Sequence, residues 1–128
     1  MTLLHSVPTR NELIFRPFVK STVSALPDAL QATYFVTREA EDSADGKIDE
    51  NQRDLVFSKI RKQDVEKALA HLGGDGASPI VFICGPPPFM LALSGHVRDL
   101  GVPKEDIRME TWWIPNANPG TKANTDTE

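Results

Sequence analysis

The chain has 128 residues, of which 40% are hydrophobic and 25% charged, as expected for one globular domain with a single core. A net charge of −4 without a basic run argues against nucleic-acid binding, and no apolar stretch approaches the roughly 20 residues of a membrane span. A single cysteine excludes a disulfide framework and a multi-cysteine metal site. The sequence therefore predicts an intracellular protein, in the cytoplasm or a mitochondrion.

The first half of the chain alternates short apolar runs with a helical pattern. Residues 2–7 form a β-compatible run at the N-terminus. Apolar residues recur at near-helical spacing over 11–26, where Pro17 leaves the first turn of the helix open. Residues 30–37 predict a second strand, and the polar, acidic stretch over 38–54 predicts a long loop.

The second half continues the alternation. Residues 62–72 carry an apolar helix face, and residues 80–84 form a continuous apolar run typical of a parallel strand buried on both faces. A helix over 88–100 and a short strand over 107–111 follow. Strands alternating with helices predict an α/β fold with a parallel sheet.

Ligands in such sheets bind beyond the carboxyl ends of the strands, here at residues 6–10, 37–39 and 84–90. The third segment, Cys-Gly-Pro-Pro-Pro-Phe-Met, follows the most apolar strand and opens a helix. Gly85 lets a flat ligand approach the backbone, the prolines supply a rigid apolar wall, and the Cys84 thiol stands at the strand tip. The alternative is a proline-rich turn with a buried structural cysteine.

The sequence predicts no metal site. His5, His71 and His96 share no metal-ligand spacing, and each is interpreted as a structural or surface residue. A cysteine hydrolase is disfavoured, because His96 lies about three helical turns beyond Cys84.

The motif over residues 84–90 resembles the nicotinamide-site motif of the ferredoxin–NADP reductase superfamily. Together with Glu-Thr-Trp-Trp at 110–113, it is most similar to the oxidoreductase NAD-binding-domain-containing branch. Weaker matches follow in the same order along the chain, at residues 6–9, 13–15, 34–39 and 58–60. The resemblance implies a partial, doubly wound parallel sheet of the ferredoxin reductase-like type. We therefore expect a partial NAD(P)-binding domain over 1–113 and a disordered tail over 114–128.

The resemblance implies part of a reductase that passes hydride from NAD(P)H to FAD and on to an acceptor, with a flavin domain or a redox protein as partner. Cys84 is the candidate catalytic residue, beside the nicotinamide. The candidate cofactor-binding residues are Ser6, Arg10, Thr37, Arg38, Cys84, Gly85, Pro86, Pro87, Met90, Trp112 and Trp113.

Each group of these residues has an implied place along the cofactor. Ser6 and Arg10 would border the adenosine end, although Pro8 stands where many relatives carry arginine. Thr37 and Arg38 resemble the Ser-Arg pair that holds the 2′-phosphate of NADP.

The remaining candidates belong to the nicotinamide end. Cys84, Gly85 and Pro86 would face the nicotinamide ring, and Met90 would anchor the turn in the core. The tryptophans at 112 and 113 resemble an aromatic group near the flavin, or else form a hydrophobic plug at the sheet edge.

Two parts of the family pattern have no match in this sequence: the flavin barrel, and the first strand with its glycine-rich phosphate loop. The sheet would then lack a central strand between residues 3–5 and 80–84. We expect the chain alone to bind nucleotide poorly and to hold no flavin. A fragment, a truncated gene model and a self-repaired fold remain open, as does a non-catalytic α/β remnant that serves as an interaction module.

Overall fold

The computed structural model describes residues 1–40, 50–72 and 78–110. The chain divides into two compact units, Met1–Pro79 and a second that begins at Ile80. The tail expected over 114–128 lies outside the described residues, so its disorder stays a prediction. None of the described helices is both long and apolar enough to cross a membrane.

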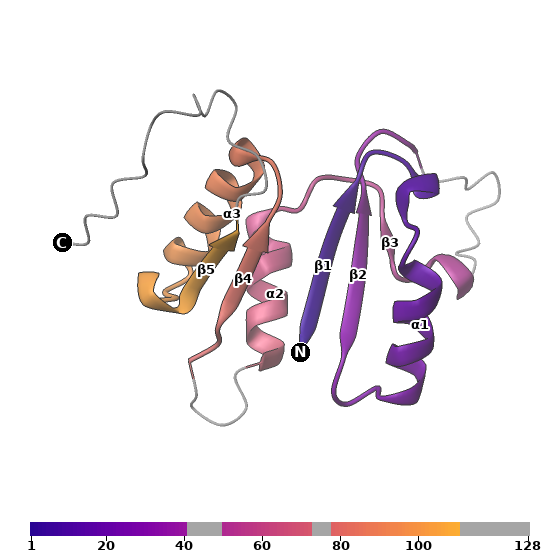
Figure 1. Cartoon of the computed structure of the whole chain (residues 1–128), viewed down its shortest axis with the longest axis horizontal. Coiled ribbons are helices and arrows are strands. Elements are labelled where there is room, and N and C mark those ends of the chain that lie inside the picture. Colours follow the sequence, from indigo (N-terminus) through magenta and orange to yellow (C-terminus); the bar gives the residue numbers. More distant parts are fainter. Residues whose placement is uncertain (41–49, 73–77, 111–128) are drawn as a thin grey trace, which may run out of the picture. The chain divides into compact units, whose positions relative to one another are not determined.

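The first unit is built on a parallel sheet (Figure 1). Strands β1 (Thr2–Val7), β2 (Gln31–Val36) and β3 (Leu55–Val56) lie in the order β1-β2-β3. Thr2 pairs with Gln31 and Val7 with Val36, so β1 and β2 begin and end at the same level. Their carboxyl ends therefore lie at one edge of the sheet.

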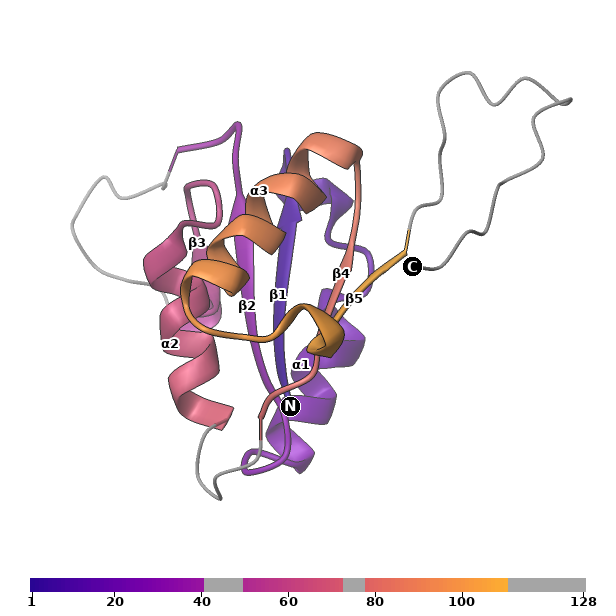
Figure 2. The ribbon, with the colours of Figure 1, turned by 90° about the vertical axis from the view of Figure 1, so that its left-hand side faces the viewer.

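Two helices cover opposite faces of this sheet, α1 (Arg16–Ala25) on one side and α2 (Lys62–Leu72) on the other (Figure 2). Tyr34 and Val36 project from β2 toward α1 and are at most 1% exposed. Burying side chains of this size contributes roughly 1.5–3 kcal/mol each. The cluster on this face comprises Val7, Leu13, Tyr34 and Val36, with Val19, Ala32, Leu55 and Phe57 packed against it.

The second unit pairs β4 (Val81–Cys84) with β5 (Ile107–Glu110) in parallel and packs α3 (Pro87–Asp99) against β4. Its buried residues are Ile83, Met90, Val97 and Val102. Short 3-10 turns occur at Arg10–Glu12, Glu50–Gln52 and Lys104–Asp106.

The α/β class and the parallel pairing predicted from the sequence are confirmed. The described strands form two sheets, in which β1 pairs with β2 and β4 with β5, so β1 and β4 are each edge strands of their own sheets. The expectation that residues 80–84 are buried on both faces is wrong. Ile83 is 5% exposed but Phe82 is 80% exposed, because alternate side chains of a strand point to opposite faces and one face of β4 is left open.

Two further expectations differ in detail. The helix expected over 11–26 is split into a 3-10 turn and α1, which places Pro17 in the first helical turn, where no backbone donor is required. The sequence did not predict strand β3, which follows directly on the segment expected to be a loop. Two residues are too few to show an alternating pattern. Helix α2 has the predicted bounds, 62–72.

Candidate functional site

The loops after β1 and β2 run side by side at the carboxyl edge of the first sheet. The Thr37 N–H donates to the Val7 carbonyl at 3.0 Å, and the Arg38 N–H donates to the Pro8 carbonyl at 2.9 Å. Ser6 is the penultimate residue of β1 and is half-buried. The structure thus brings together residues predicted from segments about thirty positions apart. Arg10, Thr37 and Arg38 lie in two adjacent loops, and Ser6 lies near the end of the strand that leads into the first of them.

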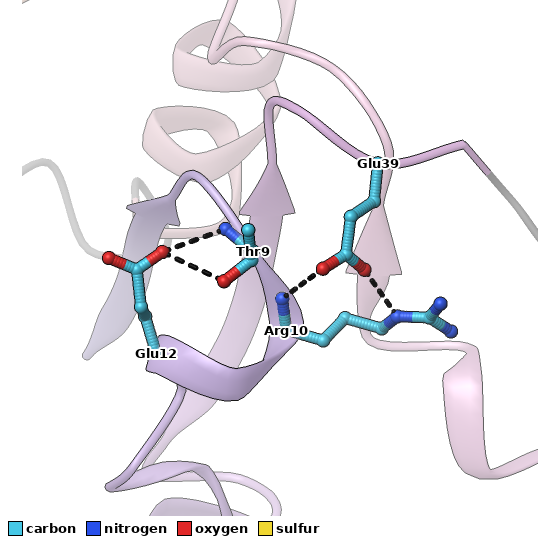
Figure 3. Close-up of polar contacts among 4 residues, drawn as sticks. All are labelled: Thr9, Arg10, Glu12 and Glu39. Carbon is cyan, nitrogen blue, oxygen red and sulfur yellow. Dashed lines mark hydrogen bonds and ion pairs between the residues drawn. The ribbon is translucent and has the colours of Figure 1, made fainter.

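An ion pair joins these two loops (Figure 3). One oxygen of Glu39 accepts a hydrogen bond from the Arg10 backbone N–H at 3.1 Å, and the other accepts from Arg10 Nε at 2.6 Å. Both side chains are partly buried, with 33% of Arg10 and 25% of Glu39 exposed. Arg10, expected to border the adenosine, therefore already has an anionic partner within the protein.

Sequence reasoning missed Glu39, although the strand register contains a signal for it. Thr2 pairs with Gln31 and Val7 with Val36, a constant offset of 29 residues. Arg10 and Glu39 have the same offset and stand three residues beyond their strands. Their pairing follows from parallel strands that end level with each other.

A second carboxylate fixes the loop that follows β1 (Figure 3). One oxygen of Glu12 accepts hydrogen bonds from the Thr9 backbone N–H at 3.0 Å and the Thr9 hydroxyl at 2.9 Å. The Arg10 guanidinium also lies 5.7 Å from the centre of the Phe57 ring. Several charge-assisted contacts therefore restrain the loop.

A partly buried cluster of side chains ties α1 to the sheet. Arg16 donates to Asp54 through Nη2 at 2.5 Å and Nε at 2.9 Å, and its guanidinium lies 5.9 Å from the Tyr34 ring centre. The Asp54 hydrogen bond raises the pKa of Arg16, and burial raises the pKa of Tyr34. His5 meets the Tyr34 ring edge-on, and burial lowers the pKa of this histidine. These side chains link the start of α1 to β2 and to Asp54, the residue before β3.

The turn between β4 and α3 is built differently. Cys84 ends β4 with its side chain exposed, so the alternative of a buried structural cysteine is wrong. Gly85 has a φ of +156°, and a Cβ built on it would lie 2.7 Å from Phe89 Cδ1. Met90 is 4% exposed, as expected of the residue that anchors the turn, and its N–H donates to the Pro86 carbonyl at 3.1 Å.

Prolines decide what this turn can bind. Helix α3 begins with Pro87 and Pro88, which have no N–H to donate. An anion at a helix N-terminus depends on such donors, so this turn fits an uncharged flat group better than a phosphate. The residues present thus fit a nicotinamide ring beside the exposed side chain of Cys84.

The predicted residues fall into groups in different units. Ser6, Arg10, Thr37 and Arg38 belong to the first unit. The residues 84–90 belong to the second unit, while Trp112 and Trp113 lie outside the described residues. Within residues 1–40, 50–72 and 78–110, no three His, Cys, Asp or Glu side chains are grouped to hold a metal ion.

Comparisons with known proteins find relatives whose names include an oxidoreductase NAD-binding domain and an NADH-cytochrome b5 reductase. The chain is 32% identical to NADH-cytochrome b5 reductase 2 of Saccharomyces cerevisiae (strain YJM789) over 98 residues, 77% of this chain and 29% of that protein. It is 26% identical over 112 residues to Oxidoreductase NAD-binding domain-containing protein 1 of Homo sapiens, covering 87% of this chain and 32% of the relative.

The Pongo abelii protein of the latter name is 23% identical over 111 residues, covering 87% of this chain and 32% of the relative. No family model matches the sequence. The chain spans about a third of the length of the relatives it matches. These homologues confirm the resemblance to the NAD(P)-binding domain of the ferredoxin–NADP reductase superfamily.

Proposed function

We propose that the chain is the nicotinamide-nucleotide-binding part of a flavin-dependent oxidoreductase, which passes hydride from NAD(P)H to FAD and on to an acceptor. The observation that carries the proposal is the exposed Cys84 thiol at the tip of β4, directly before Gly85. The names of the relatives, which include an NADH-cytochrome b5 reductase, support the same activity.

Cys84 and Gly85 would position the nicotinamide ring. When bound, the nucleotide supplies a hydride that the flavin accepts. The polarisable thiol would contact a ring face without crowding it, and the positive φ of Gly85 turns the chain from β4 into α3. Pro86 and Pro87 form a rigid wall beside them, and buried Met90 fixes the turn. These contacts would hold the ring in a near-attack orientation.

The loops after β1 and β2 would hold the adenosine end. Ser6 and Arg10 border it, and the hydroxyl of Thr37 and the guanidinium of Arg38 offer donors to a phosphate on the ribose. Backbone hydrogen bonds to Val7 and Pro8 hold the Thr37 and Arg38 main chain in place.

FAD would be held mainly by another part of the enzyme, either a flavin domain or a redox partner. The relatives are about three times as long as the matched region, which leaves room for such a domain in them. Trp112 and Trp113 would contribute the aromatic group near the flavin.

Replacing Cys84 by Ser in the assembled flavoprotein tests the proposal. The nicotinamide would lose its orientation while the adenosine contacts survive, so we expect flavin reduction to slow about tenfold with little change in nucleotide affinity. Stopped-flow absorbance measures the reduction rate, and a nucleotide titration measures the affinity. An unchanged rate would contradict a role for Cys84 in positioning the ring.

A second candidate function is a non-catalytic interaction module. It is favoured by the exposed side chains of Ile14, Phe15 and Phe18 near the start of α1, which are 77%, 67% and 73% exposed. Nucleotide binding discriminates between the two candidates, because the interaction module requires none.

A further inference from the structure

We infer that Glu39 is a specificity-determining residue, which withholds Arg10 from the cofactor and thereby favours NADH over NADPH. The inference rests on the proposed function and concerns the adenosine end of the same site. NADPH differs from NADH by a phosphate on the 2′-oxygen of the adenosine ribose, so a charged residue at this end decides between them.

The Arg10–Glu39 pair has the geometry of a built contact. Both Glu39 oxygens are engaged by the same residue, one by the Arg10 backbone N–H and the other by its Nε. The Arg38 N–H donates to the Pro8 carbonyl two residues before Arg10, which fixes the two loops relative to each other. An anion that approaches this guanidinium would therefore meet a side chain whose charge Glu39 already neutralises.

The charges within residues 8–12 and 37–40 are balanced. Arg10 and Arg38 contribute two positive charges, and Glu12 and Glu39 contribute two negative charges. A 2′-phosphate brings a charge of about −2 at pH 7 into a region without net positive charge. A ribose 2′-hydroxyl brings no charge, and it can donate a hydrogen bond to a carboxylate.

Replacing Glu39 by Gln tests the inference through binding alone. The amide is close in size to the carboxylate but has no charge, so Arg10 becomes available to a phosphate. We expect the affinity for 2′-phospho-ADP-ribose, relative to ADP-ribose, to rise about tenfold. NMR titration of the 128-residue chain measures both affinities without any flavin, even where binding is weak. The matched control is Glu12→Gln, which removes the same charge from a carboxylate bonded to Thr9 and should change the ratio less than threefold.

Two more variants are expected to change the ratio of the two affinities differently from Glu39→Gln. Arg10→Gln leaves Glu39 without its cation, so the ratio should fall below that of the unaltered chain. The double variant Arg10→Gln with Glu39→Gln should return the ratio close to its original value. A thermal melt of each protein establishes that it is folded, and Arg10→Gln keeps the inference testable if Glu39→Gln fails to fold.

The outcomes separate the inference from the proposed function. If ADP-ribose binds but neither single variant changes the ratio, the role of Glu39 is wrong. If the gain persists in the double variant, Glu39 acts by direct repulsion and the withholding of Arg10 is contradicted. If the unaltered chain binds neither ligand at any concentration tested, the proposed function itself is contradicted.

Discussion

The two loop regions at the strand ends are stabilised by opposite means. The loops after β1 and β2 are held by charge, through the Arg10–Glu39 ion pair and the hydrogen bonds between Glu12 and Thr9. The turn after β4 is held by shape, with a glycine that has no room for a Cβ. A region held by charge can discriminate among ligands by their charge, whereas a region held by shape can orient a neutral ring. In the proposed function, the first region would meet the adenosine end of the nucleotide and the second region its nicotinamide ring.

The largest change in the free energy of unfolding is expected in the turn after β4, where the lack of space at Gly85 determines the conformation. Gly85→Ala places a methyl group 2.7 Å from Phe89 Cδ1 in a backbone conformation that side chains rarely adopt, so we expect the free energy of unfolding to fall by about 2 kcal/mol. Chemical denaturation measures it. Gly95→Ala is the control, because the added methyl meets nothing within 4 Å in the middle of α3 and should stabilise the protein by about 0.5–1 kcal/mol. Equal effects at both positions would contradict the account.

A smaller loss of unfolding free energy is expected at the Arg16–Asp54 ion pair. Asp54→Asn removes the partner of Arg16, in an ion pair whose side chains are only 23% and 22% exposed, and should cost about 1 kcal/mol of unfolding free energy. Glu50→Gln breaks the exposed Arg53–Glu50 pair and should change it by less than about 0.5 kcal/mol. Denaturation curves that show equal losses of unfolding free energy for the exposed pair and the partly buried pair would contradict this expectation.

Arg38→Ala sharpens the comparison at the adenosine end. The side chain is exposed and supplies a positive charge outside the Arg10–Glu39 pair, so its loss should lower the affinity for 2′-phospho-ADP-ribose about threefold and leave ADP-ribose unchanged. The same NMR titration measures both. If 2′-phospho-ADP-ribose binds equally well to the variant, Arg38 is only a surface charge.

The smallest expected effect is a dependence of the free energy of unfolding on pH, through His5. Burial lowers the pKa of His5 below its ordinary 6.5, so the unfolded chain takes up a proton that the folded chain resists. This contribution to stability is complete above pH 6.5 and is lost as the pH falls from 6.5 toward the lower pKa of the folded state. Urea midpoints at pH 7.5 and 5.5 should differ more for the unaltered chain than for His5→Gln.

Asp64 does not interfere with that measurement. Burial alone would raise its pKa, but hydrogen bonds from Arg61 outweigh this and lower the pKa below 3.8. The contribution of Asp64 to the free energy of unfolding is therefore present above pH 3.8 and is lost only as the pH falls from there through the lower pKa of the folded state. A pH dependence between 5.5 and 7.5 that survives in His5→Gln would contradict the assignment to His5.

Local signals predicted much of the fold. Helix α2 has the predicted bounds because an apolar face and a glycine stop enclose it in the sequence. The open face of β4 could not be foreseen, because an apolar run such as residues 80–84 is the same whether one or both faces are covered. Phe82 is the residue that reveals the difference.

The turn between β4 and α3 was predicted from its motif, whereas the pairing of Arg10 with Glu39 was not. Cys84, Gly85 and Met90 occupy the expected turn, because the whole motif is contiguous in the sequence. The Arg10–Glu39 ion pair joins residues 29 positions apart, and it becomes visible only when the register of β1 and β2 is known. Contacts of this kind depend on the sheet, which local patterns do not specify.

The most direct test of a division of the nucleotide between the two loop regions is to titrate the chain separately with each half of the nucleotide. Amide NMR shifts report which loop each half contacts. ADP-ribose should shift the amides of Arg10 and Glu39, whereas nicotinamide mononucleotide should shift those of Cys84 and Gly85. Weak binding with this division of shifts is the result that the account predicts. Shifts by both fragments in the same loop, or by neither fragment in either loop, would contradict it.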